Sequence, residues 1–502
     1  MAIVLTKPGK PVSPTHQPKH PHLRATLILA CLAQFMVILD VSVVNVALPV
    51  IRRSLGFTES DLQWVVNAYT VTFAGFLLLG GRAADLLGRR RVFVWGLLLF
   101  GLASLGGGLA DSRSTLIAMR LIQGLGGAVI APASLSILTT TFTEPRERNR
   151  AVGIWGAMGG AGGAAGVLLG GVITQLLSWR WILFINVPIG LIAAFLAQRL
   201  LLEGRNPSAT RDFDLSGALS ATIGLSLLVF GIVRASSSGW GATSTLGLII
   251  GGVALLGAFV AIEGRFAKAP LMPLRLFSSR SLSAANLVVL LVGGSIFAMW
   301  FFFTLYLQEV RGYSPLHAGV IFLPMTLTIV VTSTIASRLT LRVGAKRLMT
   351  LGMVSLAVGL YLFSRLGVHS TYLGGMLAPG ELTSLGLALA FVPGTIAATA
   401  GVARQEAGLA SGILNTSRLF GGALGLAVLA TLATSRSTSD LSHPTLAVHT
   451  VGQALVNGFQ FAFVIAAGVA AVGAVAAVFG MPSLRPRAAA TPVAEPRAAV
   501  EV

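Results

Sequence analysis

Four ionisable residues stand inside long apolar stretches of the sequence, where a charge is costly. They are Asp40, Arg120, Glu381 and Arg418. An arginine at the centre of a bilayer costs about 2.5 to 3.5 kcal/mol on insertion scales, so such residues usually have a partner and a function. A buried carboxyl group can hold or release a proton as its surroundings change, and this is the chemistry we expect here.

The composition explains why these stretches are read as membrane spans. The chain has 502 residues, of which 54% are hydrophobic and 11% charged, whereas about 25% of residues in soluble proteins are charged. The mean hydropathy is +0.83. A net charge of +19 could indicate nucleic-acid binding, but the basic residues lie between apolar runs and form no basic face. We therefore predict a membrane protein with no nucleic-acid partner.

Apolar runs long enough to cross a bilayer as a helix, about 20 residues, occur fourteen times. We predict an all-α polytopic membrane protein with spans at 24–48, 62–80, 92–110, 115–139, 151–177, 181–202, 215–233, 245–263, 283–307, 316–336, 347–364, 372–398, 408–433 and 458–480.

The basic residues support this number of spans and predict the orientation. With the N-terminus inside, the inside segments hold 26 of the 36 Lys and Arg residues and the outside loops hold eight. Cytoplasmic loops carry such an excess, so we expect both termini in the cytoplasm.

A weak internal repeat divides the chain. The segment "GRAADLLGRRR" from Gly81 resembles "SRLTLRVGAKR" from Ser337, 256 residues later, although Leu341 replaces Asp85. Repeated halves are common in secondary transporters. We expect disordered tails, two six-helix domains and a linker with two extra spans, in the order 1–23 (tail), 24–202 (domain), 203–282 (linker), 283–480 (domain) and 481–502 (tail).

Asp40 and Arg120 fall at similar depths. Asp40 lies about 12 Å and Arg120 about 8 Å from the outer ends of their spans at 1.5 Å per residue. Arg120 can therefore face an aqueous cavity or pair with a carboxylate such as Asp40. Gln123 and Gly124 extend the same helix face. The alternative is an Arg120 side chain that reaches to the outer interface.

Glu381 and Arg418 lie in the predicted spans 372–398 and 408–433. Glu381 follows Pro379 and Gly380 and is either a proton carrier or a structural group bonded to freed backbone. Arg418 either pairs with Glu381 or lies at the inner interface.

Other polar and glycine residues could line a cavity or a helix contact. Asn67 and Tyr69 are cavity-lining candidates, as is Gln123, although aromatic residues in spans are more often packing or interface anchors. Glycines at spacings of 4, 3 and 4 form one face of the fifth span, which allows close helix packing. That face either slides or is a fixed seam; it consists of Gly159, Gly163, Gly166 and Gly170.

Motifs of soluble catalysis are missing from the sequence. It contains no GxxxxGK[ST] phosphate loop, no HExxH, no GxSxG and a single cysteine, Cys31. These motifs mark nucleotide hydrolysis, zinc catalysis and nucleophilic hydrolysis. We expect a protein that is not an enzyme and needs no cofactor or metal.

Taken together, six motifs resemble the fourteen-span drug/proton antiporter branch of the major facilitator superfamily. They are "LDVSVVNVALP", "GGRAADLLGRRR", "RLIQGLGGA", the glycine face of the fifth span, "WRWILFINVPIG" and "NTSRLFGGALGLAV". The resemblance implies alternating access between two six-helix domains and export of amphipathic, often cationic drugs. Protons would be the coupling ion.

The resemblance also implies roles for individual residues. Asp40 matches a residue linked to coupling or cation recognition, and Arg120 one linked to proton transfer. A cytoplasmic gating motif is matched by Gly81, Asp85, Gly88, Arg89 and Arg90, in which the carboxylate latches a helix end and nearby arginines. One departure is Val167, where the family usually has proline after the glycine. Glu381 is not part of the shared pattern.

The expected function is proton-coupled efflux across a bacterial plasma membrane by a monomer embedded in lipid. One alternative cargo is a lipid precursor, an amino acid or a secreted metabolite. Another alternative is a membrane sensor or scaffold without turnover. The outer segment 434–457 is either a partly amphipathic lid or an unstructured tether.

Overall fold

The computed structural model describes residues 22–204, 214–268, 270–400, 402, 406–442 and 450–482. The predicted tails 1–23 and 481–502 and the middle of segment 434–457 lie largely outside this range. Fourteen helices in the described part are long and apolar enough to cross a membrane, and no strand occurs in it. The predicted all-α, fourteen-span fold is confirmed.

Ten of the crossings are single α-helices. Their bounds are α1 Leu23–Leu55, α4 Arg89–Gly108, α5 Arg113–Thr141, α6 Pro145–Leu176, α9 Leu215–Ser238, α12 Pro315–Val343, α13 Ala345–Phe363, α15 Ala407–Ser442, α16 Val451–Gly480, and α3 Trp64–Leu87, which the short α2 Glu59–Leu62 precedes.

Four crossings contain a change of helix type. These are α7 Trp181–Phe184 with α8 Asn186–Leu200, α10 Thr243–Ala261 with the π-helix η1 Ile262–Phe266, α11 Arg280–Leu305 with the π-helix η3 Tyr306–Val310, and α14 Leu377–Ala400 after the π-helix η4 Tyr372–Met376. A 3₁₀ turn, η2 Leu274–Ser278, precedes α11.

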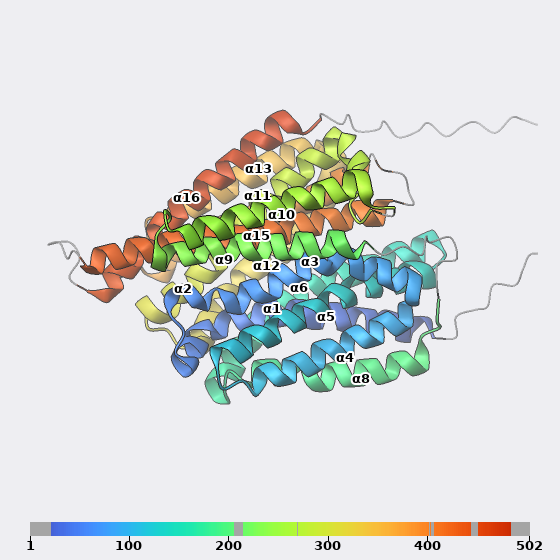
Figure 1. Cartoon of the computed structure of the whole chain (residues 1–502), viewed down its shortest axis with the longest axis horizontal. Coiled ribbons are helices and arrows are strands. Elements are labelled where there is room, and N and C mark those ends of the chain that lie inside the picture. Colours follow the sequence, from blue (N-terminus) through green and yellow to red (C-terminus); the bar gives the residue numbers. More distant parts are fainter. Residues whose placement is uncertain are drawn as a thin grey trace, which may run out of the picture.

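The helices pack as two similar halves, α1 to α8 and α11 to α16 (Figure 1). In the first half α1 packs on α6, α5 packs on α3 and α4, and α4 packs on α8. In the second half α11 packs on α15, α14 packs on α12 and α13, and α13 packs on α16. Helices at corresponding positions of the two halves therefore have the same neighbour relations.

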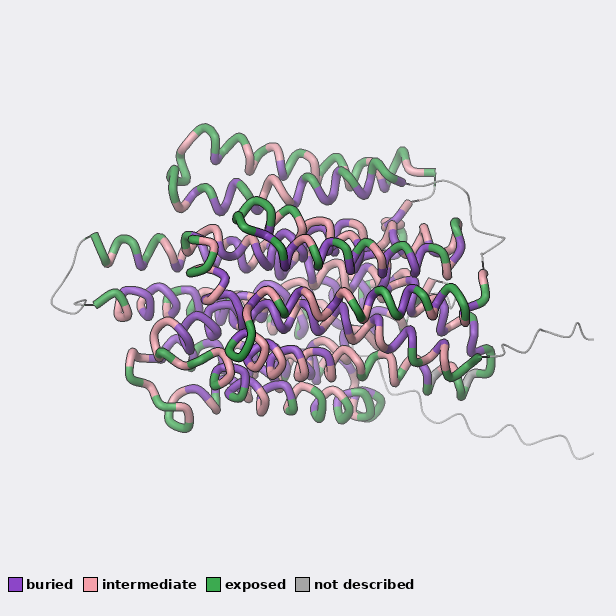
Figure 2. The backbone as a smooth tube through the Cα atoms, turned by 90° about the horizontal axis from the view of Figure 1, so that it is seen from below, coloured by how far each residue is buried: buried purple, intermediate pink, exposed green. Residues whose placement is uncertain are grey.

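The two halves meet along α3 with α15 and along α6 with α12. The inserted pair lies outside this seam, since α9 packs on α3 and α15, and α10 packs on α9. The outer position leaves α10 with only 11% of its apolar window buried. Figure 2 shows the pattern for the whole molecule, with buried residues inside and exposed residues on the outer sides of the helices.

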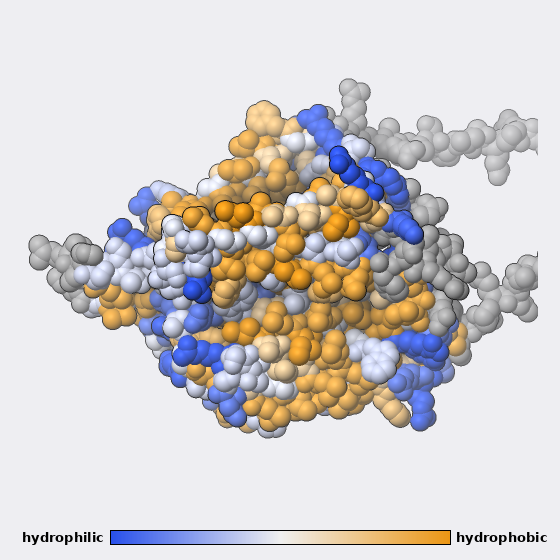
Figure 3. Space-filling view, in the orientation of Figure 1, coloured by the Kyte–Doolittle hydropathy of each residue, from blue (hydrophilic) through white to orange (hydrophobic). Residues whose placement is uncertain are grey.

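The exposed surface is that of a membrane protein. In Figure 3 apolar side chains cover the middle of the molecule and hydrophilic ones gather at its two ends. Large apolar side chains such as Trp95, Ile250 and Leu341 are 65 to 73% exposed, which suits contact with lipid. We call the end that carries Leu23 and Gly480 the termini face and the other end the opposite face.

Several helices run beyond the predicted apolar segments. The structure places helix over residues 434–442 and 451–457, so an unstructured tether is the wrong description of these parts of the predicted outer segment. Ser, Thr and Asp residues lowered the hydropathy there without ending the helix. They stand on α15, where Asp440 accepts from Asn457 Nδ2 of α16 at 2.7 Å.

Candidate functional site

Asp40 and Arg120 form a buried ion pair between α1 and α5. Asp40 is 0% exposed and Arg120 2% exposed, and Arg120 Nη1 donates to Asp40 Oδ2. The same nitrogen donates to Gln123 Oε1 at 2.8 Å, and Nε donates to the carbonyl of Val65 at 3.0 Å. Arg120 therefore does not reach to the interface, and the expected pairing with a carboxylate is present.

The other oxygen of Asp40 is bound by two amides, one from α5 and one from a further helix, α8. Gln123 Nε2 donates to Asp40 Oδ1 at 2.8 Å, and Asn186 Nδ2 from α8 donates to the same atom at 2.9 Å. Both amides also donate to Ser104 Oγ of α4 at 3.1 Å. We call these five residues the Asp40 network: Asp40, Ser104, Arg120, Gln123 and Asn186.

The network makes a buried charge tolerable. Desolvating an isolated ion costs several kcal/mol, which good geometry and additional hydrogen bonds can offset. The ring of Tyr69 adds a cation–π contact, with its centroid 4.5 Å from the Arg120 guanidinium carbon. Any change in the protonation of Asp40 would therefore be felt by four helices at once.

Asn67 and Tyr69 are core residues in this structure, with 0% and 1% of their surface exposed. Asn67 Nδ2 lies 3.5 Å from Gln63 Oε1 one turn away. Both side chains are therefore enclosed by the protein in this structure, and a cavity-lining role for them stays a prediction. Gln123, the third candidate, is also buried and belongs to the Asp40 network.

Glu381 and Arg418 do not pair with each other. Glu381 accepts a hydrogen bond from Thr328 Oγ1 of α12. Arg418 Nη2 donates to Asn415 Oδ1 at 2.9 Å, and its guanidinium lies 4.8 Å from the ring centroid of Phe391. Among the described residues no ion pair includes either charge. Sequence reasoning left the pairing open, and the structure separates the two residues.

The gating motif forms the turn between α3 and α4 on the termini face. Asp85 Oδ1 accepts from Arg89 Nη2 at 3.0 Å, and Arg89 Nε donates to Ser136 Oγ at 2.7 Å. Gly88 has a φ of +110°, which favours glycine. The Asp85 carboxylate thus holds a nearby arginine, as the resemblance implies.

Glu203 closes the same turn, and sequence reasoning missed it. It lies after α8, accepts the backbone N–H of Arg90 at 3.3 Å, and forms ion pairs with Arg90 at 3.5 Å and Arg91 at 3.6 Å. Gly81 packs on Pro132 of α5. An acidic residue at the end of the sixth span, among basic loops, was the available signal.

The glycine face of α6 is divided between two environments. A Cβ at Gly166 or Gly170 would meet Ser42, Leu39 or Val43 of α1 within 3 Å, so α1 and α6 pack there at backbone distance. A Cβ at Gly159 or Gly163 would meet no heavy atom of the described residues within 4 Å. The positions that a Cβ would block therefore lie nearer the opposite face, while at Gly163 the backbone carbonyl accepts a hydrogen bond from Ser42 Oγ of α1 at 2.7 Å.

The two halves are bonded together at the opposite face. Arg52 of α1 forms an ion pair with Glu309 of η3. Gln308 Nε2 donates to the carbonyl of Val46 at 2.7 Å, and the N–H of Leu316 donates to Gln175 Oε1 at 3.2 Å.

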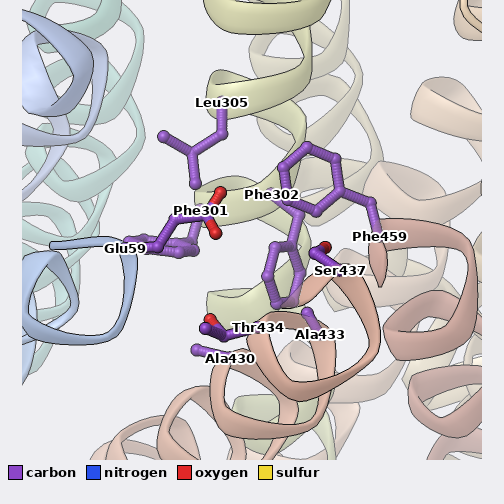
Figure 4. Close-up of a pocket in the computed structure, with 9 residues that line it drawn as sticks. All are labelled: Glu59, Phe301, Phe302, Leu305, Ala430, Ala433, Thr434, Ser437 and Phe459. Carbon is purple, nitrogen blue, oxygen red and sulfur yellow. The ribbon is translucent and has the colours of Figure 1, made fainter. Parts of the chain in front are cut away.

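A small pocket is lined by side chains of both halves (Figure 4). Glu59 of α2 enters it from the first half, and Phe301 and Phe302 of α11 line it from the second half. Side chains of both halves therefore interlock at this end of the seam.

Comparison with known proteins identifies the fold and family. A model of the Major Facilitator Superfamily matches residues 30–426 and also 285–501. The chain belongs to this superfamily. The transporter is 47% identical over 442 residues to the cephamycin export protein CmcT of Amycolatopsis lactamdurans, covering 88% of this chain and 90% of that one. It is 41% identical to the puromycin resistance protein pur8 of Streptomyces alboniger, covering 90% of each.

Solved structures share the fold at low sequence identity. A bacterial homologue of the human lysosomal transporter Spinster, in an inward-facing and unoccupied conformation, matches with a TM-score of 0.66 and 16% identity, covering 92% of this chain and 97% of that one. A D-xylose–proton symporter matches with a TM-score of 0.63 and 12% identity, covering 92% and 98%. The transporter therefore has the fold of these transport proteins.

Proposed function

We propose that the transporter exports amphipathic drugs or antibiotics across a bacterial plasma membrane in exchange for protons. The observation that carries the coupling part is the fully buried Asp40–Arg120 pair, a titratable carboxylate inside a membrane bundle. Such residues commonly form proton relays in transporters. The export and resistance proteins that the chain resembles support the choice of cargo.

The proposed orientation places the termini face in the cytoplasm, because its loops carry most of the basic residues. With the opposite face bonded shut, the structure then corresponds to a state that is closed to the outside. Domains 24–202 and 283–480 would rock against each other along α3 with α15 and α6 with α12.

In the proposed cycle a proton from outside binds Asp40 and removes the charge that Arg120, Gln123 and Asn186 hold. Each of these donors then loses its charged acceptor, and charge-assisted hydrogen bonds are about twice as strong as neutral ones. The four helices that meet at Asp40 can then repack, and the proton leaves on the cytoplasmic side as substrate binds.

The test is Asp40→Asn in the full-length protein reconstituted into vesicles. We expect ethidium transport driven by a proton gradient to fall to the level measured without a gradient. Asp111→Asn is the matched control, because this carboxylate is 92% exposed and pairs with Arg180 at the surface. Gradient-driven transport by Asp40→Asn at the rate of the control would remove Asp40 from the mechanism.

A further inference from the structure

Arg418 is a charged side chain within the membrane whose hydrogen bonds are incomplete. It lies eleven residues after the start of α15, roughly 16 Å along the helix from the termini face. Its side chain is half-buried. One guanidinium nitrogen donates to Asn415, and buried Nε has no partner among the described residues.

Arg120 in the first half shows how this fold provides partners for a buried arginine. Arg120 donates to a carboxylate, an amide and a backbone carbonyl. Among the described residues Arg418 has one neutral acceptor, Asn415, and the face of Phe391. A charge at this depth without a counter-charge is expensive, so an anionic acceptor from outside these residues would stabilise it.

Glu381, the carboxylate predicted within a span of the second half, is too far from Arg418 to act as its counter-charge. Glu381 and Phe391 stand ten residues apart on α14, which is about 15 Å along the helix axis. Since the Arg418 guanidinium lies over Phe391, α14 keeps the acid and the base apart. Glu381 is instead bonded to Thr328.

The geometry around Arg418 suits an anionic group. A guanidinium stacked on an aromatic face keeps its edge donors free, and these match the two oxygens of a carboxylate, phosphate or sulfonate. We propose that Arg418 binds an anionic group of the exported compound and so selects amphipathic acids as substrates. This inference rests on the proposed export function and extends it to a substrate class.

The test compares two probes that differ at their carboxyl group, the anion dansyl-leucine and its neutral methyl ester. Binding to the full-length protein in phosphatidylcholine nanodiscs is followed by dansyl fluorescence. We expect the wild type to bind the acid at least about tenfold more tightly than the ester, which corresponds to about 1.4 kcal/mol. Arg418→Gln should abolish the preference, and Arg418→Lys should keep part of it because the charge remains without the planar fork.

Two further variants guard against a general folding defect. Phe391→Leu leaves Arg418 in place and should weaken binding of the acid about twofold to fivefold, the loss expected for one cation–π contact. Arg342→Gln removes an exposed charge on the termini face and should leave the affinities for both probes unchanged. Equal affinities of the wild type for acid and ester, or an Arg418→Gln protein that keeps the preference, would overturn the proposal.

The headgroup of an anionic lipid could also bind the Arg418 guanidinium, and the test distinguishes a lipid from an exported acid. If the acid has no advantage but retention of phosphatidylglycerol during purification depends on Arg418, the anion is a lipid headgroup and the proposal is wrong. Gradient-driven transport in vesicles, measured with both ethidium and dansyl-leucine, reports on the proposed export function by itself. A wild type that moves neither compound would contradict export, while the binding comparison still decides the role of Arg418.

Discussion

At the scale of single residues, the number of donors on Asp40 determines what a substitution should do. Asp40 accepts from Arg120, Gln123 and Asn186, and the two amides share Ser104. A substitution that removes one donor leaves the buried Asp40 carboxylate with the two remaining donors. A substitution that removes an acceptor leaves a buried N–H group without a hydrogen bond. A buried group without its partner costs about 1–3 kcal/mol.

Gln123→Leu removes an acceptor of Arg120 and a donor of Asp40 at once. We expect it to lower the free energy of unfolding by about 1–3 kcal/mol or more, measured as a lower melting temperature in detergent. Gln198→Leu is the control, because this glutamine is exposed at the end of α8. Equal melting temperatures for the two variants would contradict the structural role of Gln123.

Sequence reasoning reached part of this site. The distances of Asp40 and Arg120 from the ends of their spans predicted similar depths in the membrane. The spacing of three residues placed Gln123 on the same helix face as Arg120. Ser104 and Asn186 could not be found in this way, because their place depends on how α4 and α8 pack on α1 and α5. The contact between the Tyr69 ring and Arg120 could not be predicted either, because it depends on how α3 packs on α5.

At the scale of elements, the turn between α3 and α4 depends on Gly88. Its φ of +110° costs about 1–3 kcal/mol for a residue with a side chain, and the Glu203 carboxylate occupies the space that a Cβ would need. The repeated turn between α12 and α13 uses Gly344 with a φ of +91°. There Leu341, which is 73% exposed, replaces the carboxylate of Asp85.

Gly88→Ala should therefore destabilise the protein through both effects, and a second substitution should separate them. Glu203→Ala removes the clash but also two partly exposed ion pairs, which are worth at most about 1 kcal/mol each. We expect the double variant to recover part of the melting temperature lost in Gly88→Ala. If the melting temperature of the double variant falls by the sum of the losses measured for Gly88→Ala and Glu203→Ala alone, the clash is not what the glycine avoids.

The elements themselves were the most predictable part of the molecule. A helix in lipid must satisfy its own backbone, so apolar runs gave all fourteen crossings. Helix ends were less predictable, since polar turns continue into water, as α15 does to Ser442. The glycine spacing of α6 predicted close packing, but which glycines meet α1 depends on how α1 and α6 cross each other within the first half.

At the scale of the whole molecule, the contacts at the opposite face control how the halves can move. Arg52 and Glu309 join α1 of the first half to η3 of the second half. Asp111 and Arg180 form a comparable pair near the same face, but both belong to the first half. Rocking of the halves must break the first pair and can leave the second intact.

This difference predicts the outcome of tethering. In a Cys31→Ser background, Arg52→Cys with Glu309→Cys is joined by a short, reducible bis-methanethiosulfonate reagent. Gradient-driven ethidium transport should then stop and return after dithiothreitol, because the outer ends of the halves can no longer part. Asp111→Cys with Arg180→Cys, tethered in the same way, should keep its transport rate. If the Arg52–Glu309 tether forms, as judged by mass spectrometry, and transport continues, then the opposite face does not open during the cycle and the alternating-access proposal fails.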